Sequence, residues 1–347
     1  MTRSSSSLVR IGVVGYGYWG PNLVRNFADL DRCKVVAVCD RDAARVAQAE
    51  RRYPGLRGVT DPRALIEAPD VDAVAIATPV ASHFELAHAA LSAGKHVLVE
   101  KPLTTTSADA ERLIALAGRH NLVLMVDHTF VYTGAVRKIR ELIAAGELGD
   151  IYYYDSVRIN LGLFQHDVDV MWDLAVHDLS IMDYVLQARP SAVSATGLAH
   201  VPGRPANIAY LTMFFDVPLL AHIHVNWLAP VKVRRTLIGG SRRMIVYDDL
   251  EVSEKVKVYD RGISVNPSPE NVYQMMVGYR AGDMWAPQLG VTEALRIEAQ
   301  HFLDCVEHGR EPETSGEVGL RVVRLLEAAT SSVSHHGRLE TLQATQV

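Results

Sequence analysis

Ile11-Gly12-Val13-Val14-Gly15-Tyr16-Gly17-Tyr18-Trp19-Gly20-Pro21 is the segment that decides the fold of this chain. Its apolar start predicts a strand over residues 9–14, and Pro21 suits the first turn of a helix, where its missing N–H costs no hydrogen bond. In the spacing Gly-x-Gly-x-x-Gly, the first Gly permits a tight turn, the second lets a pyrophosphate approach the backbone, and the third packs helix against strand. The context predicts a dinucleotide-binding turn that includes Tyr18 and Trp19. An ordinary structural turn is the alternative.

The residue that ends the next predicted strand bears on the choice of dinucleotide. Asp40 lies 20 residues beyond Gly20. An acidic side chain there binds ribose hydroxyl groups and would repel a 2′-phosphate, so it favours NAD. Arg41 could instead pair with a 2′-phosphate, so NADP stays possible.

Short apolar runs alternate with helical patterns up to residue 126. The strands are predicted at residues 9–14, 35–39, 73–77, 96–99 and 122–126, and the helices at 21–30, 42–52, 82–93 and 107–119. Continuous apolar strands separated by helices are typical of a parallel sheet covered on both faces. We therefore predict an α/β fold whose first domain, residues 1–127, is a doubly wound Rossmann domain.

The pattern changes after a helix at 134–145. Strands are predicted at 152–161, 192–199, 208–215, 220–228, 234–238, 244–247 and 255–259, with helices at 172–186, 292–308 and 317–332. Strands that follow one another without helices, several of them alternating polar with apolar, indicate an antiparallel sheet with one open face. We predict a second α+β domain over residues 128–347 with a large open, mainly antiparallel sheet.

Composition excludes several classes of protein. A chain of 347 residues with 48% hydrophobic residues fits two globular domains, and its formal net charge of -5 gives no support for a nucleic-acid or membrane partner. The three cysteines have no metal-ligand spacing, and His222 and His224 lack a third ligand, so we expect no metal site. Without a secretory or membrane-spanning segment, we expect a cytoplasmic protein.

Three side chains carry the chemistry that the sequence suggests. On a helix, Asp173 and His177 lie on one face, and a carboxylate beside an imidazole makes a tuned proton acceptor. Lys101 follows the strand at 96–99, at the carboxyl edge where open parallel sheets collect ligands, and an ammonium there can stabilise an alkoxide. The alternatives are a buried His merely satisfied by Asp, Asp178 as the true partner, and a surface Lys101 paired with Glu100.

Other residues are weaker candidates. Thr78 and Pro79 follow the strand at 73–77 and should lie near the cofactor by the same topology. His128, Arg158 and Asn160 could contact substrate hydroxyl groups, or they could form the polar face of a sheet.

Taken together, four motifs resemble those of the Gfo/Idh/MocA family of oxidoreductases. They are Gly15-x-Gly17-x-x-Gly20, Ala77-Thr78-Pro79 with His83, Glu100-Lys101-Pro102, and Asp173-x-x-x-His177. The resemblance implies a Rossmann domain, a second domain often used for dimer or tetramer contacts, and hydride transfer between a nicotinamide and a sugar or cyclitol alcohol. It implies catalytic roles for Lys101, Asp173 and His177, and cofactor contacts from His83 and Glu100. Val80 departs from the pattern, since many members carry Asn there.

Residues 15–26 and 156–164 look most like family members from nucleotide-sugar or amino-sugar pathways. That likeness implies oxidation of a hexose at C3. Our hypothesis is an NAD(H)-dependent sugar dehydrogenase in which His177, oriented by Asp173, takes the hydroxyl proton while Lys101 stabilises the oxygen. An NADPH-dependent ketoreductase, a cyclitol dehydrogenase and a non-catalytic dinucleotide sensor are the rivals.

Overall fold

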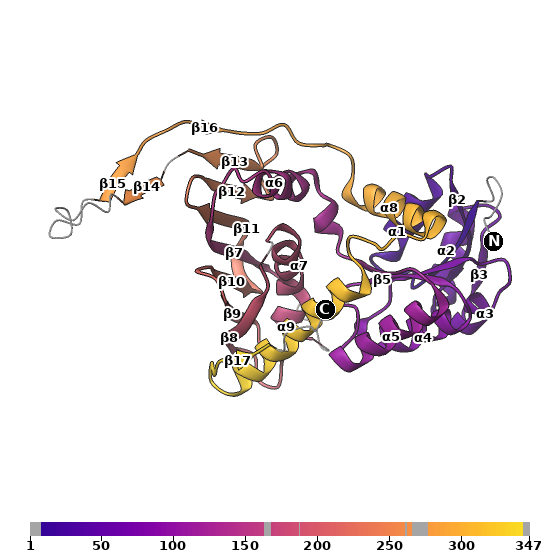
Figure 1. Cartoon of the computed structure of the whole chain (residues 1–347). Helices are drawn as coiled ribbons and strands as arrows, with labels where there is room; N and C mark the ends of the chain where they lie inside the picture. The colour runs from indigo at the N-terminus through magenta and orange to yellow at the C-terminus, as the bar shows by residue number, and fades with distance from the viewer. Residues whose placement is uncertain (1–7, 163–167, 187, 261, 266–276, 343–347) are drawn as a thin grey trace. The chain divides into compact units, whose positions relative to one another are not determined.

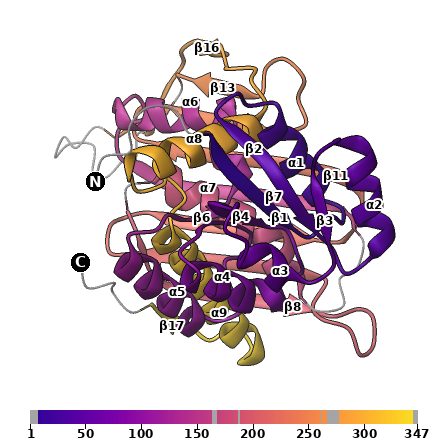
Figure 2. The same cartoon turned by 90° about the vertical axis from the view of Figure 1, so that its right-hand side faces the viewer.

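The computed structural model describes residues 8–162, 168–186, 188–260, 262–265 and 277–342 (Figures 1 and 2). The chain divides into two units. The N-terminal unit comprises Met1–Tyr132 and Thr292–Arg324, and the C-terminal unit comprises Thr133–Val291 and Leu325–Val347. The domain boundary expected after residue 127 stays a prediction.

A six-stranded parallel sheet forms the centre of the N-terminal unit, in the order β3-β2-β1-β4-β5-β6. Its strands are β1 (Val9–Val14), β2 (Cys33–Cys39), β3 (Arg57–Val59), β4 (Ala73–Ile76), β5 (His96–Glu100) and β6 (Leu124–Asp127). Every residue of β4 is buried, as expected for a sheet with helices on both faces. The predicted Rossmann fold is confirmed, and its strand order reverses between β1 and β4.

Helices surround this sheet (Figure 2). They are α1 (Gly20–Ala28), α2 (Ala43–Arg52), α3 (Pro62–Ile66), α4 (His83–Ser92), α5 (Ser107–His120) and α8 (Ala294–His308), with 3-10 turns η1 (Val80–Ser82) and η2 (Thr129–Tyr132). The short β3 and α3 were not predicted, because three and five residues carry no readable periodicity.

Helix α8 comes from far along the chain and packs on α1. The Phe27 and Phe302 rings meet edge to face, with their centroids 6.2 Å apart. Arg25 forms an ion pair with Glu293, just before α8. This packing makes α8 part of the N-terminal unit and brings its buried face to the sheet end that carries the functional residues.

The C-terminal unit is built on a nine-stranded sheet, in the order β16-β13-β12-β11-β7-β10-β9-β8-β17. Its strands are β7 (Ile151–Leu161), β8 (Pro190–Leu198), β9 (Ile208–Phe215), β10 (Leu220–Asn226), β11 (Leu228–Gly240), β12 (Met244–Asp248), β13 (Val256–Tyr259), β16 (Met284–Trp285) and β17 (Glu340–Thr341). The β7–β10 pair is parallel and the other pairs of this sheet are antiparallel. The mainly antiparallel sheet is confirmed. Strands β14 (Gly262–Val265) and β15 (Val277–Arg280) pair separately.

Among the described residues, helices cover one face of this sheet and none covers the other. In Figure 1, α6 (Gly134–Ala144), α7 (Val176–Val185) and the end of α9 (Gly316–Ser334) lie on the same side of the sheet. Along β9, Leu211 and Met213 are buried, whereas Tyr210 and Phe214 are 40% and 38% exposed. The alternation fits a sheet with a single covered face. No helix in the described part of the chain is long and apolar enough to cross a membrane.

Candidate functional site

The turn between β1 and α1 has the geometry that its glycines predict. Gly15 has φ +97°, and a Cβ there would lie 2.4 Å from the Ala77 carbonyl oxygen. A Cβ on Gly20 would lie 2.0 Å from the Gly15 carbonyl oxygen. At Gly17 the nearest atom would be Nη1 of Arg45, at 3.4 Å, so the space beside Gly17 is open. Two glycines therefore close the turn, and the third leaves room for a ligand against the backbone.

Asp40 is held beside that turn. Its Oδ2 accepts a hydrogen bond from the Tyr16 backbone N–H at 2.7 Å, and its Oδ1 accepts one from Asp42 at 2.9 Å. This places a carboxylate where a dinucleotide's ribose hydroxyls would bind, so the residues present fit NAD. Arg41 is exposed. Arg45, which the sequence analysis missed, brings Nη1 to 3.6 Å from Asp40 Oδ2.

The loop after β4 is tied to the loop after β5 through His83. Its two ring nitrogens each lie 2.8 Å from a carbonyl oxygen, that of Thr78 and that of Pro102. Burial lowers the pKa of His83, and the two carbonyl contacts partly oppose that shift. The Thr78 hydroxyl also accepts a hydrogen bond from Ser82. His83 thus shapes the loops that carry Thr78, Pro79 and Lys101.

Lys101 lies at the same edge of the sheet as the glycine turn. Strands β1, β4 and β5 are neighbours, with Val14 opposite Ile76 and Ile76 opposite Val99, so their carboxyl ends meet. Lys101 follows β5 directly, and its backbone N–H donates to Glu100 Oε2 at 3.2 Å. The structure therefore brings Gly15, Thr78 and Lys101 together within the N-terminal unit.

In the C-terminal unit, Asp173 lies on a π-helical turn, η3 (Met171–Ala175), rather than on the ordinary helix that we predicted. The Val176 N–H reaches back five residues to the Met171 carbonyl. Such turns are rare and occur often at functional sites. His177 follows in the first turn of α7.

Trp227 fixes the Asp173 carboxylate. The indole Nε1 donates to Asp173 Oδ2 at 3.1 Å, and Trp227 is only 1% exposed. Its ring packs so closely on Gly162 that a Cβ there would lie 2.7 Å from the ring. Sequence reasoning missed Trp227, which is distant in the chain and carries no local signal.

Asp178, the alternative partner for His177, is occupied elsewhere. Its Oδ2 accepts from Arg158 Nε at 2.7 Å, and its Oδ1 accepts from Ser156 at 2.8 Å. Arg158 is 3% exposed, so its guanidinium forms a buried ion pair with Asp178 on the covered face of the sheet. Its placement gives no support to a direct substrate contact.

The two remaining substrate candidates lie in different units. His128 follows β6 and is buried in the N-terminal unit. Asn160 is half-buried near the end of β7 in the C-terminal unit. Among the described residues, no group of three or more His, Cys, Asp or Glu side chains is arranged to hold a metal ion.

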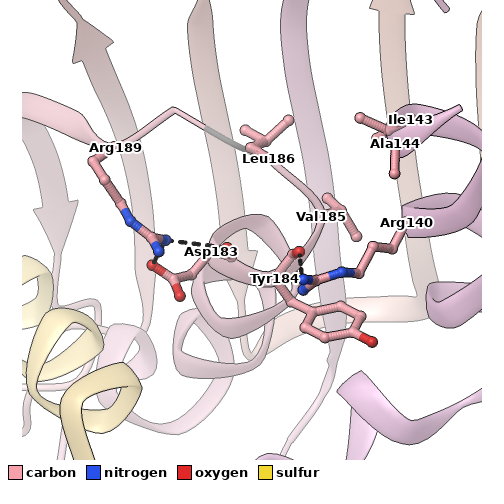
Figure 3. A pocket seen from close by; sticks show the side chains of 8 residues that line it. All are labelled: Arg140, Ile143, Ala144, Asp183, Tyr184, Val185, Leu186 and Arg189. Carbon is pink, nitrogen blue, oxygen red and sulfur yellow. Dashed lines mark hydrogen bonds and ion pairs between the residues drawn. The ribbon is translucent and has the colours of Figure 1, made fainter. Parts of the chain in front are cut away.

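A cavity of about 280 Å³ on the C-terminal unit contains none of the predicted site residues (Figure 3). It is lined by Arg140, Ile143, Ala144, Asp183, Tyr184, Val185, Leu186 and Arg189. Arg140 donates to the Tyr184 carbonyl and lies over its ring, and Arg189 is paired with Asp183. Because its cations already have protein partners, we do not assign this cavity to the site.

Comparison with known proteins identifies two family models in the chain. A model described as an oxidoreductase family with an NAD-binding Rossmann fold matches residues 9–128. A model described as the GFO/IDH/MocA C-terminal domain matches residues 136–246.

Individual relatives are similar over most or part of the chain. UDP-N-acetylglucosamine 3-dehydrogenase of Acidithiobacillus ferrooxidans is 30% identical, over 91% of this chain and 94% of that protein. Its solved structure matches with a TM-score of 0.80 at 27% identity, covering 94% of this chain and 99% of that one. dTDP-3,4-didehydro-2,6-dideoxy-alpha-D-glucose 3-reductase of Saccharopolyspora spinosa is 38% identical over 43% of this chain and 45% of that protein.

Proposed function

Because the chain belongs to the Gfo/Idh/MocA family of NAD-binding oxidoreductases, we propose that it oxidises a sugar-ring secondary alcohol, at C3 of a nucleotide-linked hexose, to a ketone with NAD⁺. We place this reaction in sugar or antibiotic biosynthesis. The observation that carries the proposal is Lys101 at the sheet edge beside the glycine turn and Asp40. The similarity to a UDP-N-acetylglucosamine 3-dehydrogenase over 91% of the chain supports the substrate class.

In this proposal the N-terminal unit holds the cofactor. Gly15, Gly17 and Gly20 give the backbone room for the pyrophosphate, and Asp40 accepts hydrogen bonds from the ribose hydroxyls. Tyr18, Trp19, Thr78, Pro79 and His83 would line the rest of the cofactor's path. When bound, NAD⁺ supplies the acceptor for the hydride that leaves the sugar carbon.

The chain's own residues handle the proton. His177 takes the proton of the reacting hydroxyl group, and Asp173, anchored by Trp227, supports the charge that His177 gains. Lys101 donates a hydrogen bond to the same oxygen and stabilises its developing negative charge. In the reverse direction, His177 returns the proton to the ketone oxygen.

A second candidate, an NADPH-dependent reductase of a keto-deoxysugar, is favoured by two observations. The first is the similarity to the Saccharopolyspora spinosa 3-reductase, and the second is Arg45 beside Asp40. A guanidinium at that corner can pair with a 2′-phosphate. Asp40, which would repel that phosphate, leads us to prefer NAD⁺.

We further propose a cytoplasmic enzyme that works as a homodimer or homotetramer. Three buried cysteines without disulfides support a reducing compartment. The open sheet face with Tyr210 and Phe214 exposed supports self-association. The partners proposed are the sugar or nucleotide-sugar substrate and further copies of the chain.

The test is NADH formation by the purified protein with UDP-N-acetylglucosamine, dTDP-linked hexoses and myo-inositol as separate substrates. We expect oxidation of a nucleotide sugar, with NMR of the product placing the new ketone at C3. Preference for myo-inositol would favour the cyclitol alternative. NAD⁺ binding without turnover of any substrate would favour a dinucleotide sensor.

A further inference from the structure

Three carboxyl groups converge behind the glycine turn of the N-terminal unit. Glu100 ends β5, Asp127 lies opposite it at the end of β6, and Glu298 comes from the inner face of α8. Asp127 and Glu298 are buried, and Oε1 of the half-buried Glu100 has no solvent contact. We call these three residues the carboxyl triad.

The triad contacts the glycine turn through Trp19. The indole Nε1 donates to Asp127 Oδ2 at 3.0 Å, while the Thr129 hydroxyl donates to Asp127 Oδ1. Trp19 immediately precedes α1, the helix whose N-terminus a pyrophosphate would approach. Asp127 therefore restrains the part of the turn nearest the proposed cofactor.

Hydrogen-bond accounting assigns protons to the two glutamates. Neither oxygen of Glu298 has a hydrogen-bond partner among the described residues, and the Thr129 hydroxyl that it faces already donates to Asp127. As a carboxylic acid, Glu298 can donate to the neighbouring Asp127 carboxylate, and Glu100 can do the same through its unpartnered Oε1. Asp127 would then accept four hydrogen bonds, the number that one carboxylate accommodates.

The surrounding charges agree with that assignment. Glu298 faces Asp127, Glu100 and the Thr129 hydroxyl, and burial followed by Asp127 raises its pKa. Burial and Asp127 also raise the pKa of Glu100, outweighing the opposite effect of Lys101. Three carboxylates here would repel one another, whereas two carboxylic acids can each donate a hydrogen bond to one anion.

We propose that Asp127 is a positioning residue for the dinucleotide turn, acting on Trp19 as the single anion of a carboxyl triad in which Glu100 and Glu298 are protonated. The inference rests on the proposed function, since it assigns the turn to NAD⁺. Losing a triad proton places a second negative charge against Asp127 and disturbs its contact with Trp19. NAD⁺ affinity therefore falls as the pH becomes alkaline.

The experiment is calorimetric titration of NAD⁺ into the full-length protein, without sugar, from neutral to alkaline pH. Three variants accompany the wild type. Glu298→Gln cannot ionise, Trp19→Phe removes the indole N–H, and Glu307→Gln is the matched control on α8, where Glu307 pairs with Arg32 at the surface.

The wild type and the Glu307→Gln variant should both lose NAD⁺ affinity by at least threefold at alkaline pH. The loss should be smaller in the Glu298→Gln variant, where only Glu100 can still ionise, and absent from Trp19→Phe, which should also bind NAD⁺ more weakly throughout. An alkaline loss of equal size in Glu298→Gln, or a pH-independent wild type, overturns the proposal. A wild type that binds no NAD⁺ at any pH instead removes the proposed function.

Discussion

The carboxylate of Asp40 accepts a 2.7 Å hydrogen bond from the backbone N–H of Tyr16, inside the glycine turn. This bond joins the end of β2 to the turn after β1, so the residue proposed to bind the ribose also stabilises the turn proposed to bind the pyrophosphate. A change at Asp40 should therefore affect both cofactor choice and affinity.

Asp40→Ser should weaken NAD⁺ binding roughly 10- to 100-fold, because a hydrogen bond to a charged group contributes about 1.5–3 kcal/mol. It should also improve NADP⁺ binding, because a serine hydroxyl does not repel the 2′-phosphate as the Asp40 carboxylate does. Nη1 of Arg45, which lies 3.6 Å from Asp40 Oδ2, could then pair with that phosphate. Titrations of both cofactors measure this. Adding Arg45→Ala to Asp40→Ser should abolish the gain in NADP⁺ affinity. Adding Arg41→Ala instead is the control and should leave that gain in place. Unchanged cofactor preference in Asp40→Ser would refute the assigned role.

Substitutions at Gly15 and Gly17 should separate folding from binding. Gly15→Ala meets a positive φ and a carbonyl 2.4 Å from its Cβ, so it should destabilise the protein by several kcal/mol. Gly17→Ala has room, so its unfolding free energy should stay within about 1 kcal/mol of wild type while NAD⁺ affinity falls at least tenfold. Urea denaturation and calorimetry report the two effects. Wild-type affinity in a folded Gly17→Ala variant would contradict the pyrophosphate assignment.

Trp227→Phe removes the indole donor from Asp173 while keeping an aromatic ring in place. We expect kcat to fall about tenfold with little change in KM, since a misplaced carboxylate affects proton transfer more than binding. Steady-state kinetics on the sugar substrate measure the split. Trp172→Phe is the matched control, because its indole donates to Thr330 in the same unit. Equal losses in both variants would point to general destabilisation.

The raised pKa of Glu298 predicts the pH dependence of stability. The folded protein holds this proton above the pH at which the unfolded chain releases it, so stability falls as pH rises from the unfolded value, 4.5, towards the folded one. Glu298→Gln does not ionise. The melting temperature of this variant, relative to that of the wild type, should therefore increase as pH rises from about 5 to about 8. Thermal melts across this range test the sign. A melting temperature of Glu298→Gln that instead falls relative to the wild type as pH rises would show that Glu298 is a stabilising carboxylate.

Local patterns allowed much of the fold to be predicted. Strand β1 and strand β9 have the expected bounds, because continuous or alternating apolar residues mark them. Strand β11 begins earlier than expected. Pro230 and Lys232 interrupt its apolar pattern, but β11 already pairs with β7 at Leu228. A strand's length depends on its partner, which the segment itself does not show.

The site was predictable where the chemistry lies next to an element boundary. Gly15, Asp40 and Lys101 each follow a predicted strand, so topology alone placed them at one edge. Trp227 and Glu298 meet their partners from distant segments of the chain, which no local pattern reveals. The π-helical turn at Asp173 differs from the predicted α-helix only in its backbone hydrogen bonds, which the apolar pattern does not show. The alternation of polar and apolar residues along β7 was read correctly at Arg158. However, the side chain lies on the buried face of the sheet, where it pairs with Asp178 of α7.

The most direct test of the central claim is the rate of NADH formation in a single turnover with saturating NAD⁺ and sugar. Lys101→Ala and His177→Ala should each slow this step by roughly 10²- to 10⁴-fold, the usual contribution of a positioned proton-transfer group. NAD⁺ affinity should remain measurable and the melting temperature close to that of the wild type. Near-normal rates in both folded variants would contradict the claim that these two side chains act on the reacting hydroxyl group.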